Sequence, residues 1–300
     1  MSHHTTDTTP SSSFSIDGYS LRAPRLEPGL YLVSTPIGHL KDITLRALET
    51  LAASSLVACE DTRVSRVLLS HYGISVPLMA YHEHNADEAS TKILQALDAG
   101  PVSLISDAGT PLISDPGSRL VSKVLENNHK VIPIPGASAV LAGLVTAGLG
   151  DAQFYFAGFL PVKEKARADA LQSLKKTNGT LVFYESPKRI AATLATTAQV
   201  LGPDRRAVIG RELTKRFETF YRGTLHDLAQ EFANSATPKG EIVLLVERTT
   251  DQEEAIDLDS ALKTRLAKVS LKQAVQDVGE ISGLPRRKIY QRALQIRDAE

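Results

Sequence analysis

Tryptophan is absent from this chain of 300 residues, and cysteine occurs once, as Cys59. A single cysteine excludes an internal disulfide and a metal site built on several cysteines. No apolar run approaches the roughly 20 residues of a membrane-spanning helix, and the Ser/Thr-rich start lacks the apolar core of a secretory signal. Together these absences favour a protein of the cytoplasm with no membrane contact.

Three common active-site motifs are missing as well. Without G-x-x-x-x-G-K-[ST] a P-loop NTPase is not expected, and without G-x-G-x-x-G after a strand an ordinary dinucleotide fold is not expected. No G-x-S-x-G elbow marks a hydrolase nucleophile. His82 and His84 face one side of an extended chain, but no third ligand is obvious, so we predict no metal site.

Charge is balanced overall, with 34 Lys and Arg against 34 Asp and Glu, but it is unevenly spread. Residues 161–189 carry seven basic and three acidic side chains, and residues 261–300 carry nine and four. Residues 251–259 contain five acidic side chains and no basic one. A basic stretch of this kind fits a solvated helix face or contact with a phosphate backbone, and composition does not decide between them.

Short β-rich runs alternate with helical runs from residue 28 onward. Strands are predicted at 30–33, 56–58, 78–81, 102–105 and 130–134, and helices at 44–53, 64–69, 86–97 and 118–127. A second series has strands at 154–156, 180–184, 206–209, 218–221 and 242–246, and helices at 137–147, 165–175 and 189–201. This alternation predicts an α/β fold with a largely parallel sheet, and more strand-to-strand neighbours in the second half.

The pattern divides the chain into five parts. We expect a disordered tail at 1–27, α/β domains at 28–135 and 136–248, an acidic linker at 249–259 and a basic helical segment at 260–300. The last part has a helix, a Gly-bearing turn and a helix that opens with Arg and Lys. That order is typical of a helix-turn-helix unit, although short helical tails also serve packing or dimerisation.

Polar corners follow the predicted strands, where open α/β sheets bind their ligands. They are STPIG at 34–38, EDTR at 60–63, YHEHN at 81–85 and LISDAGTPLISDPGSR at 104–119. The last corner has Asp and Gly but neither Lys nor Arg before residue 119, which favours a ligand with hydroxyls and a cation over a phosphate. An Asx-turn with Asp115 or Ser118 as N-cap explains one of its two acidic turns.

Longer segments resemble the tetrapyrrole methylase superfamily, class III of the S-adenosylmethionine-dependent methyltransferases. They are LYLVSTPIGHLKDITLRAL, ACEDTR, YHEHN, SDAGTPLISDPG, PIPGASA, FYFAGFLP, FYESPKR, RELTK and PKGEIVLLVE. Within the superfamily they are most similar to the branch that methylates the ribose 2′-oxygen of a cytidine in 16S ribosomal RNA, where Ser106-Asp107-Ala108 replaces a Gly-Asp-Pro-like loop. The resemblance implies two α/β domains with a cofactor cleft between them, a helical C-terminal segment and a homodimer.

The resemblance also implies which residues contact S-adenosylmethionine. Those expected along the cofactor are Asp107, Gly109 and Thr110, with Ser138 and Ala139 at its amino-acid end, Phe183 and Tyr184 beside the adenine, Pro238, Lys239 and Gly240 closing over it, and Ile37 and Gly38 at the methyl end. Alternatives to the RNA acceptor are a corrin precursor, the modified histidine of a translation factor, and a non-enzymatic role as an RNA-binding assembly factor.

Transfer of a methyl group to a ribose hydroxyl is an in-line displacement, so alignment supplies much of the rate. Because the hydroxyl is a poor acid, a base or a cation beside it adds roughly 10²–10⁴-fold. Glu60, Asp61 and Arg63 are the first candidates, and the alternative for them is a helix-capping ion pair that contributes little at a surface. The further candidates are His84, Asn85, Lys188, Arg211, Glu212 and Lys215.

Overall fold

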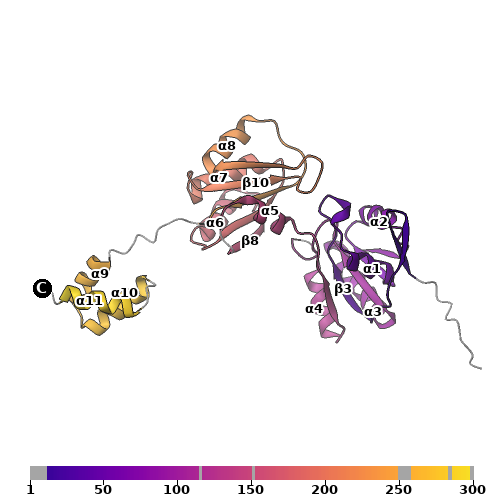
Figure 1. Ribbon diagram of the computed structural model, residues 1–300, viewed down its shortest axis with the longest axis horizontal. Coiled ribbons are helices and arrows are strands. Elements are labelled where there is room, and N and C mark those ends of the chain that lie inside the picture. Colours follow the sequence, from indigo (N-terminus) through magenta and orange to yellow (C-terminus); the bar gives the residue numbers. More distant parts are fainter. Residues whose placement is uncertain (1–11, 115–116, 151–152, 249–257, 283–285, 298–300) are drawn as a thin grey trace, which may run out of the picture. The chain divides into compact units, whose positions relative to one another are not determined.

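The computed structural model describes residues 12–114, 117–150, 153–248, 258–282 and 286–297 (Figure 1). The chain divides into two compact units, with the boundary between Glu247 and Arg248. Most of the stretch that we predicted as an acidic linker, residues 249–257, lies outside the described residues. So does Asp115, which we considered as a helix cap.

The first sheet of the larger unit has five parallel strands. Their order is β5 (Leu78–Ala80), β4 (Leu56–Cys59), β6 (Pro101–Ile105), β3 (Gly29–Val33) and β7 (Val131–Ile134). Parallel strands end at one edge of the sheet, so the corners STPIG, EDTR, YHEHN and SDAGTP emerge together there. The prediction of a parallel α/β sheet is confirmed for this part.

Helices cover both faces of the first sheet. Helices α1 (Leu45–Ala53) and α2 (Thr62–His71) pack on one face, and α3 (Ala86–Ala99) and α4 (Ser118–Glu126) on the other. Two 3₁₀ turns, Leu40–Asp42 and Glu83–Asn85, precede α1 and α3. Thr44 caps α1 by accepting a hydrogen bond from the Ala47 N–H at 3.1 Å, which fixes where that helix begins.

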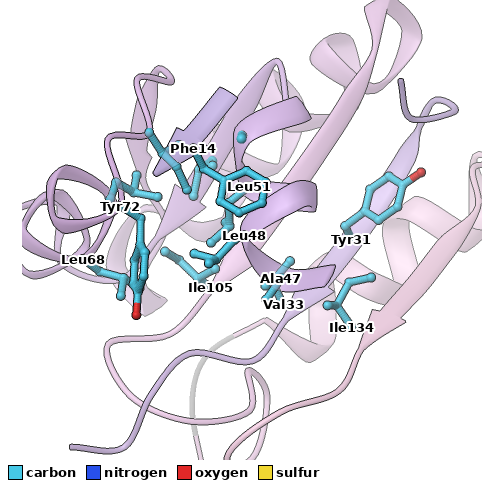
Figure 2. Close-up of a cluster of buried hydrophobic side chains, with 14 of the residues drawn as sticks. Phe14, Tyr31, Val33, Ala47, Leu48, Leu51, Leu68, Tyr72, Ile105 and Ile134 are labelled. Atoms are coloured by element: carbon cyan, nitrogen blue, oxygen red, sulfur yellow. The ribbon is translucent and has the colours of Figure 1, made fainter. Parts of the chain in front are cut away.

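The prediction of a disordered tail over residues 1–27 is wrong for residues 13–22. Strands β1 (Ser13–Ile16) and β2 (Tyr19–Arg22) form an antiparallel hairpin. Phe14 is 2% exposed and packs among Leu48, Leu51 and Tyr72 (Figure 2). One buried aromatic side chain and a backbone hydrogen bond from Ser15 to Tyr72 therefore order a segment whose composition is that of a flexible chain.

The second sheet is mixed, and its consecutive strands β10 (Arg206–Arg211) and β11 (Thr219–Thr224) agree with the strand-to-strand neighbours predicted for this half. Its order is β11, β10, β12 (Ile242–Val246), β9 (Thr180–Glu185) and β8 (Phe154–Phe159), and only β8 and β9 pair in parallel. Residues 212–218 connect β10 to β11. A link this short cannot make the crossover that a parallel pair needs, so these two strands pair antiparallel.

Helices also cover both faces of the second sheet. Helices α6 (Glu164–Leu174), α7 (Ile190–Leu201) and α8 (Leu225–Asn234) enclose one core, and α5 (Ala139–Ala147) packs on the opposite face. Helix α8 was missed by the sequence analysis, although Thr224 and Asp227 form a capping box at its start.

The smaller unit contains α9 (Leu258–Leu266), α10 (Leu271–Ser282) and α11 (Arg286–Arg297). Leu262, Val275 and Ile289 are at most 1% exposed at its core, and Arg265 approaches Asp277 at 3.5 Å. The helical segment expected at 260–300 is thus present, and its first helix begins at Leu258. Across the described parts of both units, none of the helices is long and apolar enough to cross a bilayer.

Candidate functional site

The larger unit contains a cavity of about 350 Å³ that is lined from both of its sheets. This volume falls in the range of small-molecule sites, roughly 300–1,000 Å³. The cavity lies at the carboxyl edge of the first sheet and on the α5 face of the second. Its lining residues are Ile37, Asp107–Thr110, Ile113, Ser114, Ser138, Ala139, Phe159, Tyr184–Pro187, Leu213 and Gly240–Val243.

Three strand ends of the first sheet are tied together to form one wall. Thr35 and Gly109 exchange two backbone hydrogen bonds, at 2.8 and 3.1 Å. The Ser34 hydroxyl donates to Thr110 Oγ1 at 3.1 Å, and Thr110 Oγ1 donates to the Ala137 carbonyl at 3.3 Å. Gly109 has φ of +80° and lies against Ile37, so a side chain there would strain the backbone.

Helix α5 begins at the cavity. Its N-cap is Ser138, whose hydroxyl accepts from the Leu141 N–H at 3.4 Å, and both Ser138 and Ala139 line the cavity. The first turn of a helix carries N–H groups without an intrahelical partner and a partial positive charge. This wall therefore favours an anionic group such as a carboxylate.

Asp107 supplies a carboxylate to the same cavity. Its Oδ1 accepts a hydrogen bond from the Asp61 N–H at 3.0 Å. Partial burial raises the pKa of Asp107, and the hydrogen bond from Asp61 opposes that shift. The site therefore pairs an acidic side chain with the positive end of a helix, an arrangement that suits a ligand carrying both an ammonium and a carboxylate.

Asp61 and Arg63 form a chelated ion pair beside Asp107. Asp61 accepts from the Arg63 N–H at 2.8 Å, from Nε at 3.0 Å and from Nη2 at 2.6 Å. These hydrogen bonds lower the pKa of Asp61 to about 2. A carboxylate that is ionised and bonded in this way is a poor proton acceptor, so Asp61 orients Asp107 and Arg63. Glu60 is exposed and lies outside the cavity lining.

We expect Arg63→Ala to raise the pKa of Asp61 from about 2 toward its ordinary value of 3.8, because the largest contribution comes from the Arg63 side chain. The measurement is an NMR titration of the Asp61 carboxyl in both proteins. A carboxyl group whose pKa is lower in the folded protein than in the unfolded chain stabilises the fold at any pH above its unfolded-state pKa. That contribution is lost as the pH falls through its folded-state pKa. The stabilisation therefore disappears between about pH 4 and pH 2, and identical titration curves would contradict the ion pair.

The YHEHN candidates lie away from the cavity lining. Asn85 is held by its neighbours, because it accepts from the His82 N–H and donates to the Ala80 carbonyl, both at 2.9 Å. His84 is exposed. Over the part of the chain that the structure describes, no three His, Cys, Asp or Glu side chains gather as metal ligands.

The RELTK segment joins the second sheet to the first. Leu213 lines the cavity, and Lys215 bonds Glu212 at 2.8 Å and Glu241 at 3.0 Å. Burial alone would lower the pKa of Lys215, but these two hydrogen bonds raise it. Gly38 packs against this segment instead of lining the cavity, since an added Cβ would lie 2.4 Å from the Lys215 side chain.

Arg211 and Lys188, the two remaining catalytic candidates, also lie outside the cavity lining. Arg211 donates to the Lys239 carbonyl at 3.0 Å and to the Phe217 carbonyl at 3.2 Å, so it fixes two loops. Lys188 is exposed and follows Pro187 of the cavity lining. Among the catalytic candidates, none lines the cavity itself.

The second sheet corrects part of the predicted cofactor set. Tyr184 lines the cavity, with Phe159 at 5.7 Å between ring centroids. Phe183 is fully buried on the opposite face, in the core beneath α6, α7 and α8, because successive strand residues point to opposite faces. The Phe183 side chain therefore does not reach the cavity that Tyr184 lines. Gly240 lines the cavity, whereas Pro238 and Lys239 do not.

Glu185 is a site residue that the sequence analysis missed. Its side chain is 0% exposed, and the residue belongs to the cavity lining. It accepts from the Ser186 N–H at 2.7 Å and from the Thr193 hydroxyl at 2.6 Å, and Arg189 Nε lies 3.2 Å away. Arg189 also donates to the Leu160 carbonyl. The pair therefore ties the turn after β9 to the end of β8, and both segments line the cavity.

Comparison with known proteins identifies the class of this fold and site. Residues 29–229 match the family of tetrapyrrole (corrin/porphyrin) methylases, and residues 252–297 match the RsmI C-terminal HTH domain. The chain belongs to the tetrapyrrole methylase family, which confirms the resemblance read from its motifs.

One curated relative and two solved structures illustrate the similarity. A protein of Mesorhizobium japonicum named ribosomal RNA small subunit methyltransferase I is 52% identical over 275 residues, which is 91% of this chain and 94% of the relative. A diphthine synthase structure matches with a TM-score of 0.60 at 17% identity, over 74% of this chain and 90% of that one. Uroporphyrin-III C-methyltransferase from Thermus thermophilus, complexed with S-adenyl homocysteine, matches with a TM-score of 0.53 at 18% identity, over 72% and 96%. At these identities the two structures establish the fold alone.

Proposed function

We propose that this protein is an S-adenosylmethionine-dependent methyltransferase that modifies the ribose 2′-oxygen of a cytidine in 16S ribosomal RNA. The observation that carries the proposal is the 52% identity, over 94% of its length, with a relative named as a methyltransferase of the small-subunit RNA. Such agreement extends through both sheets and into the helical unit, so it covers the cavity and the segments around it.

The cavity fits S-adenosylmethionine in size and chemistry. The start of α5 suits the carboxylate of the amino-acid end, and Asp107 suits a cation or a pair of hydroxyls. Phe159 and Tyr184 provide aromatic surface for the adenine, and Ile37, Leu213 and Val243 provide apolar walls. When bound, the sulfonium supplies an electrophilic methyl group, and the walls exclude water and hold the donor in line with the acceptor oxygen.

Asp107, Arg63 and Asp61 have different roles at the mouth of the cavity. Asp107 Oδ1 already accepts from Asp61, and no second protein donor to Asp107 occurs among the described residues, so its other oxygen is available to a ligand. Arg63 is 87% exposed beside it and presents a cation to the RNA backbone. Asp61 keeps both groups in position through its ion pair and its backbone N–H.

We further propose that the protein acts in the cytoplasm as a homodimer and that its helical unit contributes to RNA binding. Helix α5 supports the dimer, since it is apolar on most sides and leaves Leu141 53% and Val145 81% exposed. The helical unit opens α11 with three exposed basic residues, Arg286–Lys288, which fits contact with phosphates.

The molecule that receives the methyl group distinguishes RNA methylation from the alternative functions. With labelled S-adenosylmethionine, we expect the purified protein to label small-subunit RNA, offered either naked or in assembled subunits. Label on a corrin precursor or on a translation factor, with none on RNA, would assign the same fold to another acceptor. RNA binding without any turnover would identify a non-enzymatic assembly factor.

A further inference from the structure

A large aromatic side chain stands in solvent on the short link between β10 and β11. Phe217 is 64% exposed, and the Arg216 guanidinium lies over its ring at 5.5 Å from the centroid. A single exposed apolar residue is ordinary on a protein surface. An arginine stacked on an exposed ring is more specific, because it holds the ring and a cation in one place.

Hydrogen bonds hold this turn in a defined shape. The Glu218 N–H donates to the Lys215 carbonyl at 3.1 Å, and the Thr214 N–H donates to the Glu218 carboxylate at 2.7 Å. Arg211, itself anchored to the Lys239 carbonyl, donates to the Phe217 carbonyl at 3.2 Å. The Phe217 ring is thus presented from a backbone fixed on both sides, which lowers the entropy lost when a ligand stacks on it.

The turn lies at the rim of the cavity. Leu213, four residues before Phe217, belongs to the cavity lining. Lys215 bonds Glu241 at 3.0 Å, and Glu241 lines the cavity as well. On the other side the His39 N–H donates to the Thr214 hydroxyl at 3.2 Å, which fixes the turn against the corner after β3. A molecule that reaches into the cavity from this side therefore passes close to Phe217.

The charges around Phe217 favour an anionic partner. The acidic side chains nearby are already engaged, since Glu212 and Glu241 bind Lys215 and Glu218 accepts from Thr214. Within the described residues, Arg216 forms no ion pair, and its guanidinium lies over the Phe217 ring. An aromatic face beside an unneutralised arginine matches a nucleotide, whose base stacks on the ring while its phosphate meets the cation.

We propose that Phe217 is a stacking platform for an unpaired nucleobase next to the nucleotide being methylated, with Arg216 contacting a neighbouring phosphate. This inference rests on the proposed RNA methyltransferase activity and deepens it, because it names a specificity-determining contact for the acceptor. Single-stranded RNA is the expected form, since its bases can splay out onto an aromatic ring and the bases of a duplex cannot.

The test compares Phe217→Ala, Phe217→Trp and Arg216→Ala with the wild type in methyl transfer to small-subunit RNA. Phe217→Ala is expected to raise KM for RNA by about 5- to 150-fold, the range of one lost base stack, while calorimetry gives an unchanged Kd for S-adenosylmethionine. Phe217→Trp keeps a stacking face and retains a KM near that of the wild type. Arg216→Ala is expected to reduce the slope of log affinity for RNA against log salt concentration by about one, which corresponds to the loss of one phosphate contact.

Tyr19→Ala is the matched control, because Tyr19 is also an exposed aromatic residue, at 78%, but belongs to the β1–β2 hairpin. Its KM for RNA should stay at the wild-type value. If Phe217→Ala keeps the wild-type KM for RNA, this inference is overturned while the proposed function stands. The same holds if sedimentation shows a dimeric wild type and a monomeric Phe217→Ala, because the ring would then serve self-association. Failure of the wild type to label RNA would overturn the proposed function together with the inference.

Discussion

Replacing Asp107 with alanine is expected to weaken binding of S-adenosylmethionine by about 10- to 100-fold. Asp107 is the carboxylate of the first sheet that lines the cavity, and a hydrogen bond to a charged group contributes about 1.5–3 kcal/mol, which corresponds to this range of affinity. Isothermal titration calorimetry measures the effect directly. The fold is expected to persist, because Asp107 is exposed and makes a single hydrogen bond within the described protein.

Asp107→Asn provides the matched control for this prediction. The amide oxygen can still accept from the Asp61 N–H, so the corner keeps its shape while the charge is removed. An affinity between those of the wild type and Asp107→Ala would separate the charge from the local geometry. If Asp107→Ala binds the cofactor as tightly as the wild type, Asp107 is not part of the site.

Removing the Glu185 carboxylate is expected to lower the free energy of unfolding more than any of the other substitutions proposed. Glu185→Ala leaves the Ser186 N–H and the Thr193 hydroxyl without their acceptor and leaves Arg189 without its ion-pair partner. Breaking a buried ion pair on one side costs about 3–5 kcal/mol. We place this change at the lower end, about 3 kcal/mol, because the Arg189 side chain is 24% exposed. Hydrogen exchange of the β9 and α7 amides measures the effect where it arises.

A double variant distinguishes the ion pair from simple loss of packing. In Glu185→Ala with Arg189→Met, no charge is left unpaired, so the double variant should be more stable than Glu185→Ala alone. Glu185→Gln keeps the shape and one acceptor, and an intermediate loss is expected. Equal protection in Glu185→Ala and the wild type would show that the pair does not hold the cavity wall.

The first sheet was predictable because its strands are short, buried and separated by polar corners. Parallel strands bring their carboxyl ends together, so the grouping of STPIG with SDAGTP follows from the pattern alone. The second sheet was harder to predict, since alternation of strands and helices does not distinguish a crossover from a short antiparallel link. The seven residues between Arg211 and Thr219 carried that information.

The motifs predicted which segments form the site. They did not predict on which face of the sheet each side chain lies. FYESPKR contains both Phe183 and Tyr184, yet only Tyr184 reaches the cavity, because the side chains of a strand alternate. Strict alternation from Tyr184 would have placed Phe183 in the core. Glu185 was missed for a different reason: a fully buried carboxylate needs partners that lie apart in sequence, such as Thr193, and those appear only when the turn is folded.

The position of the transferred methyl group tests the central claim most directly. Small-subunit RNA labelled by the protein from S-adenosylmethionine is digested with alkali, which cleaves RNA only where a free 2′-hydroxyl can attack the adjacent phosphate. We predict label in an alkali-resistant dinucleotide whose first nucleoside is cytidine, and about 10- to 100-fold less of that label with Asp107→Ala at limiting cofactor. Label recovered in mononucleotides would mean that the methyl group is on a base, and would contradict ribose 2′-O-methylation by this protein.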